Sequence, residues 1–168
     1  MSEGLVSDLR RVDLAAGLMP PHHPICFGCG PDSPQGFHLQ VHRDGDEMLT
    51  EHVFEDRHSG APGIAHGGAV ATVVDDVLGF LLYVAQVPGV TRTLEVEYLR
   101  PVRIAVPYVV RSQLDQRDGR KLWVSCTGTD PDGVAAFRGK GLFLAVDRSH
   151  FARVQPAGTT VSAAPVAP

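Results

Sequence analysis

The most regular hydrophobic pattern in the chain lies between residues 67 and 87. Apolar side chains recur there at intervals of three and four, which places them on one face of a helix. These side chains are Val70, Val73, Val74, Val77, Leu81 and Val84. The pattern predicts a helix that begins near Gly67 or Gly68 and ends by Val87, because Pro88-Gly89 stops it. About 18 residues would make it roughly 27 Å long.

Three Asp-Gly pairs mark tight turns between stretches that alternate or run apolar. They are Asp44-Gly45, Asp118-Gly119 and Asp132-Gly133, and each supplies a residue suited to the positive φ of a hairpin turn. The pattern predicts that residues 37–42 pair with 48–54, 106–114 with 121–129, and 121–129 with 134–146.

One further strand is predicted directly after the helix, over residues 91–99. Leu94, Val96 and Tyr98 alternate there with polar side chains, which indicates a half-buried strand. Pro101 and Pro107 fit strand ends. The resulting order is two strands, one helix and four strands. We expect an α+β fold in which a curled antiparallel sheet of five to six strands wraps around one long central helix.

The length of 168 residues corresponds to one domain with tails. We expect an N-terminal arm or short helix at residues 1–23, the domain itself at 24–148, and a disordered, Ala/Pro-rich C-terminal tail at 149–168.

Composition and charge exclude several classes of protein. The chain is 43% hydrophobic with a net charge of −4, which argues against disorder and against a nucleic-acid binder. No uncharged apolar run reaches the ~18 to 20 residues of a membrane span, so we expect no membrane association. Glu3 and Asp8 stand where a secretory signal would be basic and apolar. The 3 cysteines are too few for a disulfide scaffold, which predicts a cytoplasmic protein.

Two features of the predicted helix depart from its apolar pattern. It opens with His66-Gly67-Gly68, where unpaired backbone N–H groups and the helix dipole could hold an anion or a developing oxyanion. It also carries Asp75 and Asp76 opposite the valine face. We interpret Asp76 as a solvated side chain. A partly desolvated Asp75 would have a raised pKa, which suits a general base or nucleophile.

Four segments resemble the hotdog-fold thioesterase superfamily, in particular its PaaI-like acyl-CoA thioesterases. They are Cys-Phe-Gly-Cys-Gly-Pro at 26–31, Pro-Gly-Ile-Ala-His-Gly-Gly-Ala at 62–69, Val-Asp-Asp at 74–76, and Thr-Arg-Thr-Leu-Glu-Val-Glu-Tyr-Leu-Arg-Pro at 91–101. The resemblance extends over roughly residues 24–146. It implies that the protein hydrolyses an acyl-CoA thioester without a cofactor or metal.

The resemblance also implies roles for individual residues. Asp75 would activate water or attack the thioester itself, and Gly67 would donate its N–H to the thioester oxygen. Thr91 would position the water or the carboxylate, while His66 shapes the helix entrance and, with Gly68, lines the site. Many relatives have Asn or Gln shortly before the Pro-Gly pair, but this chain has His58 and Ser59 there, so we consider both as substitutes.

Helix geometry places a condition on this mechanism. Gly67 and Asp75 are separated by about 12 Å along one helix, whereas the reacting carbon must lie about 3 Å from both groups. Two antiparallel helices of a two-fold dimer would satisfy both distances. We therefore expect a homodimer or a dimer of dimers, as the resemblance also implies.

The remaining candidates concern the substrate and the cysteines. An acyl-CoA requires positive charge at a surface rim, for which Arg100 and Lys140 are the leading candidates, with Arg103 and Arg138 also possible. Val74, Leu78, Leu81 and Tyr83 would wall the acyl pocket. Cys26 and Cys29 form a C-x-x-C motif near His22 and His23, but a second pair of ligands is missing from the sequence. We favour a structural turn over a metal site there.

Two other functions stay open at this stage. One is a non-catalytic hotdog protein that binds or senses acyl-CoA, and the other is an enoyl-CoA hydratase-like hotdog enzyme. The spacing of His66 and Asp75 favours the thioesterase.

Overall fold

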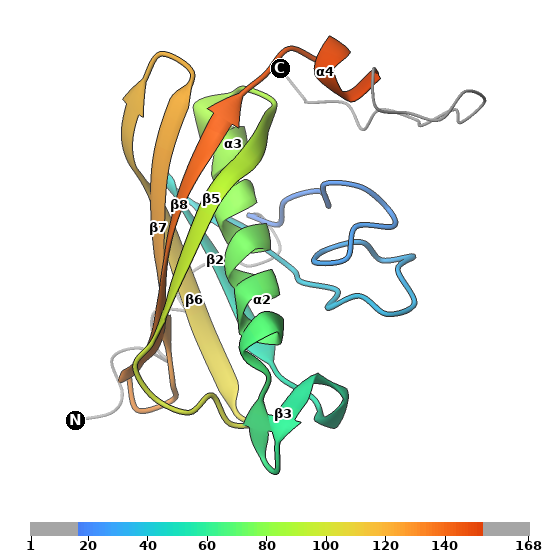
Figure 1. Ribbon diagram of the computed structural model, residues 1–168, viewed down its shortest axis with the longest axis vertical. Coiled ribbons are helices and arrows are strands. Elements are labelled where there is room, and N and C mark those ends of the chain that lie inside the picture. The colour runs from blue at the N-terminus through green and yellow to red at the C-terminus, as the bar shows by residue number, and fades with distance from the viewer. Residues whose placement is uncertain (1–16, 153–168) are drawn as a thin grey trace.

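The computed structural model describes residues 17–152 and has a six-stranded antiparallel sheet that curves around one long helix (Figure 1). The strands lie in the order β1-β2-β6-β7-β8-β5. They are β1 (His42–Asp44), β2 (Glu47–Val53), β5 (Gly89–Tyr98), β6 (Pro107–Asp118), β7 (Lys121–Thr129) and β8 (Ala135–Ala145). A 3-10 turn η1 (Asp56–His58) and a small hairpin, β3 (Ser59–Ala61) and β4 (Ile64–Ala65), precede the helix. The predicted hotdog fold is confirmed.

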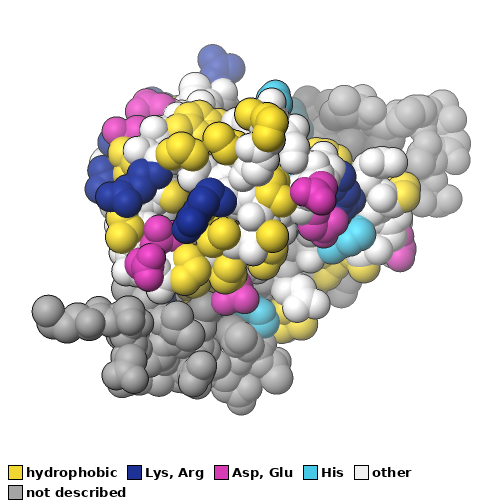
Figure 2. All heavy atoms as spheres, turned by 90° about the horizontal axis from the view of Figure 1, so that it is seen from below, with side chains coloured by type: hydrophobic (Ala, Val, Ile, Leu, Met, Phe, Trp, Pro, Cys, Tyr) yellow, Lys and Arg dark blue, Asp and Glu magenta, His cyan; other side chains and the backbone are white. Residues whose placement is uncertain are grey.

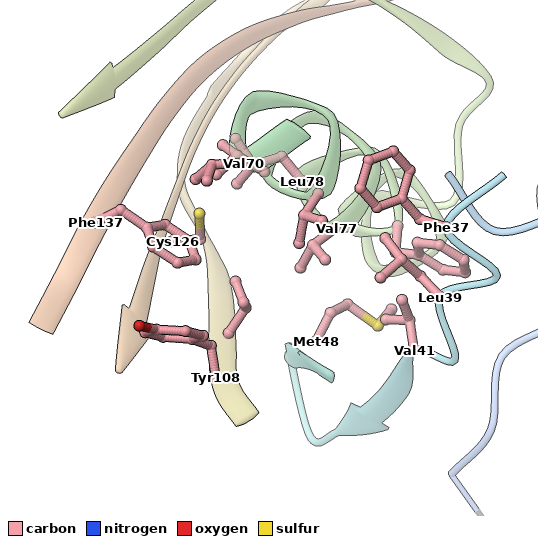
Figure 3. Close-up of a cluster of buried hydrophobic side chains, with 14 of the residues drawn as sticks. Phe37, Leu39, Val41, Met48, Val70, Val77, Leu78, Tyr108, Cys126 and Phe137 are labelled. Atoms are coloured by element: carbon pink, nitrogen blue, oxygen red, sulfur yellow. The ribbon is translucent and has the colours of Figure 1, made fainter. Parts of the chain in front are cut away.

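The central helix begins where the sequence predicts, as α2 (Gly67–Gly79), and continues after a break at Phe80 as α3 (Leu81–Ala85). It ends at Gln86, which adopts a left-handed conformation with φ 55°. Its valine face is buried against the sheet: Val70, Val73, Val74 and Val77 are 0% exposed. Figure 3 shows Val70, Val77 and Leu78 of the helix among core side chains of the sheet.

The hydropathy of the central helix is higher than we expected from the sequence. Residues 67–85 are long and apolar enough to cross a membrane by length and composition, which the sequence analysis did not expect. Half of that stretch is buried inside the protein, as in the core helix of a globular domain, so the pattern is weak evidence for a membrane span.

The predicted hairpins β6–β7 and β7–β8 are confirmed by their antiparallel pairing. The prediction for residues 37–42 is wrong in most of its length, because only His42 of this range belongs to β1. His38 adopts a positive φ of 52°, which interrupts an extended strand. The Phe37 N–H donates to the Phe27 carbonyl and the Leu39 N–H donates to the Gly28 carbonyl, so neither group pairs with strand β2. Phe37 and Leu39 are nevertheless buried, so the apolar pattern of this segment correctly indicated burial but not a strand.

The sheet approaches the helix closely at β8. A Cβ on Gly139 would lie 2.3 Å from Val74 Cγ1 and 2.9 Å from Cys126 Sγ, so only glycine fits at this position. Cys126 is 4% exposed and packs as a small apolar side chain, as expected.

Both predicted tails extend beyond the described residues. Of the arm at 1–23, the structure places residues 17–23, where Leu18 bridges to His42 next to β1. The rest of this predicted arm or short helix, residues 1–16, lies outside the described range. Of the tail at 149–168, Ser149–Ala152 form one short helix, α4, and the rest lies outside that range.

We predict that His52 makes stability fall in acid. Burial, followed by the nearby His58, lowers the pKa of His52 to about 4, and its Nε2 atom is buried without a partner. The unfolded chain therefore binds the additional proton, so stability is lost as pH falls from the unfolded value of 6.5 toward 4, by about 3 kcal/mol at most. Denaturant titrations of wild type and His52→Phe between pH 7 and 4 measure how the free energy of unfolding changes with pH. The same pH dependence in both proteins would contradict the role of His52.

Candidate active site

A groove of about 420 Å³ lies between the loop before the helix and the first turns of α2. Its walls are formed by Phe27, Gln35, Phe37, Arg57, His58, Ser59, His66, Gly68, Ala69 and Thr72. Four of these residues are among the site residues predicted from the sequence: His58, Ser59, His66 and Gly68. The fold therefore collects them on one surface, although two come from the η1–β3 segment and two from the helix entrance.

His66 closes the start of α2 with its own side chain. Its backbone is extended, with φ −63° and ψ 138°, and its Nδ1 atom accepts a hydrogen bond of 2.8 Å from the Gly68 N–H. This is an N-cap interaction, which uses one of the unpaired donors of the first turn. Because Nδ1 is occupied as an acceptor, His66 is placed to shape the helix entrance and not to serve as the base.

The Gly67 N–H is a free donor at this entrance. Within residues 17–152, no group accepts a hydrogen bond from it. The Gly67 carbonyl is held from the opposite side by the Tyr98 hydroxyl, which donates to it at 2.7 Å. From the sequence, Tyr98 was identified only as an apolar strand residue, because no local pattern indicates a hydrogen bond between residues 31 positions apart.

Asp75 lies on the outward face of α2 and is held by β5. The Thr91 hydroxyl donates a hydrogen bond of 2.9 Å to Asp75 Oδ1. The β5–β8 register shifts between Thr91 and Thr93, and such a bulge changes the direction of the side chains beside it. The contact that the resemblance implied between Thr91 and the carboxylate is therefore present.

The surroundings of Asp75 raise its pKa. Partial burial is the largest cause, and the hydrogen bond from Thr91 opposes it by stabilising the ionised form. A carboxylate with a raised pKa that still has one fixed hydrogen bond is a stronger base than a solvated one, and its remaining oxygen is available to water.

Asp76 was predicted to be solvated, and this is wrong. It is only 9% exposed, because residues 22–29 cover the side of the helix on which it lies. Its Oδ1 atom contacts His22 Nδ1 at 3.2 Å and Cys26 Sγ at 3.4 Å. The helical wheel placed Asp76 away from the valine face correctly, but it could not indicate that a distant loop covers this face.

His58 is buried and stacks on Phe37, with ring centroids 4.4 Å apart. Its Nδ1 atom accepts a hydrogen bond of 3.0 Å from the Glu55 N–H, so the proton of the neutral ring is on Nε2. Burial, followed by the charge of Arg57, lowers the pKa of His58 and favours this neutral form. His58 lines the groove, but its Nε2 atom is buried and has no hydrogen-bond partner among the described residues.

The predicted basic residues differ in their availability. Lys140 lies opposite Glu95 in the β5–β8 register, and Arg138 is 3.8 Å from Glu97. Arg100 is exposed, and among the described residues no carboxylate pairs with its side chain. It lies just after β5, and its backbone N–H donates to the Ala136 carbonyl of β8 at 3.0 Å.

Four side chains were predicted to line the pocket for the acyl chain, and this prediction is wrong for three of them. Val74, Leu78 and Leu81 are 0%, 0% and 1% exposed and belong to the core under the sheet, whereas Tyr83 is only partly buried. A second cavity, of about 630 Å³, lies at the other end of the helix around Pro88, Arg120 and Arg148, far along the chain from the residues above.

Comparisons with known proteins agree with this architecture. Residues 62–136 match the profile of the thioesterase superfamily. The chain is 34% identical over 124 residues to acyl-coenzyme A thioesterase THEM4 of Bos taurus, covering 72% of this chain and 51% of the relative. The chain thus spans about half the length of this curated relative.

Solved structures show the same fold. Protein RHA08564, a thioesterase superfamily protein, aligns with a TM-score of 0.66 and 26% identity over 73% of this chain and 60% of its own. A hypothetical thioesterase protein from Streptococcus pneumoniae, solved with coenzyme A, aligns with a TM-score of 0.61 and 15% identity over 64% and 85%. The E. coli PaaI protein aligns with a TM-score of 0.62 and 10% identity over 66% and 81%.

The matched profile begins in the loop before α2 and ends in β8, so it contains the helix entrance, Asp75 and Thr91. Together with the sheet that curves around one helix, it shows that this chain belongs to the thioesterase superfamily, with the hotdog fold.

Proposed function

We propose that this protein hydrolyses acyl-CoA thioesters to a free acid and CoA. The observation that carries the proposal is the hydrogen bond from Thr91 to the half-buried Asp75, on the same helix as the free Gly67 N–H. The similarity to an acyl-coenzyme A thioesterase and to a thioesterase protein solved with coenzyme A supports the choice of substrate.

The chemical step requires a base and an oxyanion donor. Asp75 takes a proton from water as the water oxygen attacks the thioester carbon, and the carbonyl oxygen becomes an oxyanion that the Gly67 N–H stabilises. Collapse of this intermediate breaks the C–S bond, and the CoA thiolate leaves and is protonated. If Asp75 attacks directly instead, water hydrolyses the resulting anhydride and the overall balance is the same.

The two groups cannot meet within one subunit, because eight residues of helix separate them by about 12 Å. We therefore propose a two-fold dimer in which Gly67 of one protomer faces Asp75 of its partner. Strand β5 supports this arrangement. It is one of the two edge strands of the sheet, it is 10 residues long, and within residues 17–152 no other strand pairs with its outer side.

The CoA phosphates require cations near the helix entrance. Figure 2 views the molecule from the end that carries the β3–β4 hairpin and shows Lys and Arg side chains there beside hydrophobic ones. Of the predicted cations, Arg100 fits best because its charge is not paired within the described residues. Lys140 is a weaker candidate because Glu95 lies opposite it.

The direct test is Asp75→Asn in a thiol-release assay with short, long and aromatic acyl-CoAs. The substitution removes the base, so we expect turnover to fall by about 10²- to 10⁴-fold while circular dichroism and elution volume stay unchanged. Unchanged turnover would contradict the role of Asp75. A wild-type protein that binds acyl-CoA without releasing thiol would favour a sensing module, and loss of an enoyl absorbance without thiol release would favour a hydratase.

The oxyanion donor can be removed by Gly67→Pro. Proline is favourable in the first position of a helix and lacks an N–H, and the extended backbone of His66 is compatible with a following proline. We expect a loss of about 10²-fold or more, whereas Gly67→Ala, which keeps the donor, should retain most activity.

Mixing these variants tests the dimer. In a mixed dimer of Asp75→Asn and Gly67→Pro, one site is intact and the other has lost both groups. Random exchange of subunits should therefore restore about one quarter of wild-type activity from two inactive proteins. If both groups acted within one subunit, mixing would restore nothing.

The pH profile tests the contact with Thr91. The base must be ionised, so kcat/KM should rise with pH through the pKa of Asp75. Thr91→Val removes the hydrogen bond that lowers this pKa, so the acidic limb of the profile should move to higher pH. Thr93→Val, an exposed threonine of the same strand, is the control, and a profile that moves equally in both variants would contradict the assignment.

The cationic rim is tested by Arg100→Gln. Loss of a charged hydrogen bond to phosphate should raise KM for acyl-CoA roughly tenfold or more with little change in kcat. Arg43→Gln, on β1 at the opposite edge of the sheet, should leave KM unchanged. An unaltered KM in Arg100→Gln would remove this residue from the binding site.

A further inference from the structure

We propose that His22, Cys26, Cys29 and Asp76 bind a zinc ion that fastens residues 22–29 to helix α2. The four ligand atoms lie within 4.8 Å of one another, although Asp76 is 47 or more positions away in the sequence. From the sequence we favoured a structural turn over a metal site, because the C-x-x-C motif had no second pair of ligands. The fold supplies that pair from the preceding segment and from the helix.

The distances between the ligand atoms fit a tetrahedral ion. Zinc bonds of about 2.3 Å to sulfur and about 2.0–2.2 Å to nitrogen and oxygen produce edges between ligand atoms of roughly 3.3–3.8 Å. His22 Nδ1 lies 3.2 Å from Asp76 Oδ1 and 3.4 Å from Cys29 Sγ. Cys26 Sγ lies 3.4 Å from Asp76 Oδ1. A small outward adjustment of each side chain would accommodate the ion at the centre.

The backbone around the cysteines is already arranged to support thiolates. The Gly30 N–H binds the Cys26 carbonyl at 2.9 Å, which closes a tight turn. The backbone N–H groups of Gly28 and Cys29 donate to Cys26 Sγ, and the His22 N–H donates to Cys29 Sγ at 3.3 Å. Hydrogen bonds from backbone donors to sulfur stabilise the charged form that a metal requires.

The buried carboxylate is an independent observation in favour of a cation. Asp76 is 9% exposed, and its Oδ2 atom has no hydrogen-bond partner among the described residues. An ionised carboxylate in such a position is costly unless a positive charge compensates it. Gly28 makes this close packing possible, because a Cβ there would lie 2.2 Å from Asp76 Cγ.

The donor set favours zinc in a structural role. Two sulfurs, one imidazole nitrogen and one carboxylate oxygen form a mixed set suited to tetrahedral zinc, whereas calcium and magnesium prefer oxygen ligands alone. Four protein ligands leave no open position for substrate. The imidazole is fixed by aromatic rings, with Phe80 4.1 Å and Tyr83 6.0 Å away between centroids. Because Asp76 is adjacent to Asp75, the ion would immobilise the helical turn that carries the proposed base.

The test measures metal content and needs no substrate, so its outcome is independent of the proposed hydrolysis. The full chain is purified under reducing conditions and dialysed against zinc and then against a metal-free buffer. The zinc content of the dialysed protein, measured by elemental mass spectrometry, should be about one ion per chain. Asp76→Asn and Cys29→Ser should lower this content at least tenfold. Cys126→Ser is the matched control, because this buried thiol lies outside the cluster and its loss should leave the zinc content unchanged.

A second measurement on the wild type avoids the risk that a variant fails to fold. Replacement of zinc by cobalt(II) should produce thiolate-to-metal charge-transfer absorption and the visible bands of a tetrahedral ion. Chelation should lower the melting temperature and expose Cys26 and Cys29, but not Cys126, to alkylation. Three results would each overturn the proposal. The reduced wild-type protein could retain no metal, or its cobalt spectrum could be that of an octahedral site with oxygen ligands. The third is a Cys26–Cys29 disulfide in protein that was never exposed to oxidant.

Discussion

The burial of one face of α2 against the curved sheet is the interaction on which the rest of the structure depends. Val70, Val73, Val74 and Val77 are completely buried there, and each valine or leucine transferred from water contributes about 1.5–3 kcal/mol. Gly139 allows the sheet to approach the helix closely. Because this face is fixed, the opposite face of the helix has a defined orientation, and Asp75 and Asp76 lie on it.

The polar face of the helix is divided between two neighbours. Strand β5 contacts it on one side, through Thr91 at Asp75 and through Tyr98 at the Gly67 carbonyl. The segment 22–29 covers it on the other side, at Asp76. Adjacent carboxylates therefore have different environments: one is half-buried and accessible, and the other is enclosed among sulfur and imidazole. This division allows the catalytic role proposed for Asp75 and the structural role proposed for Asp76 to occupy consecutive residues.

The separation of Gly67 from Asp75 relates the proposed chemistry to assembly. A rigid helix keeps the free N–H and the carboxylate apart in each subunit, so only a second copy can bring them together. The long edge strand β5 and the exposed parts of α2 are the surfaces available for that contact. In this proposal, the dimer is a condition of catalysis, since neither subunit contains a complete site.

Local sequence determined the helix, its limits and most of the strand pairing, because periodic burial and the Pro-Gly and Asp-Gly turns depend on near neighbours. It also determined that His66 and Gly67 begin a helix and that Asp75 follows two turns later. It could not determine that residues 37–41 leave the sheet, that Leu78 faces the core instead of a pocket, or that Asp76 is covered by His22 and two cysteines. Those features arise from contacts between segments 22–29, 67–79 and the sheet. Such contacts depend on how the chain closes on itself, which no periodic pattern within one segment records.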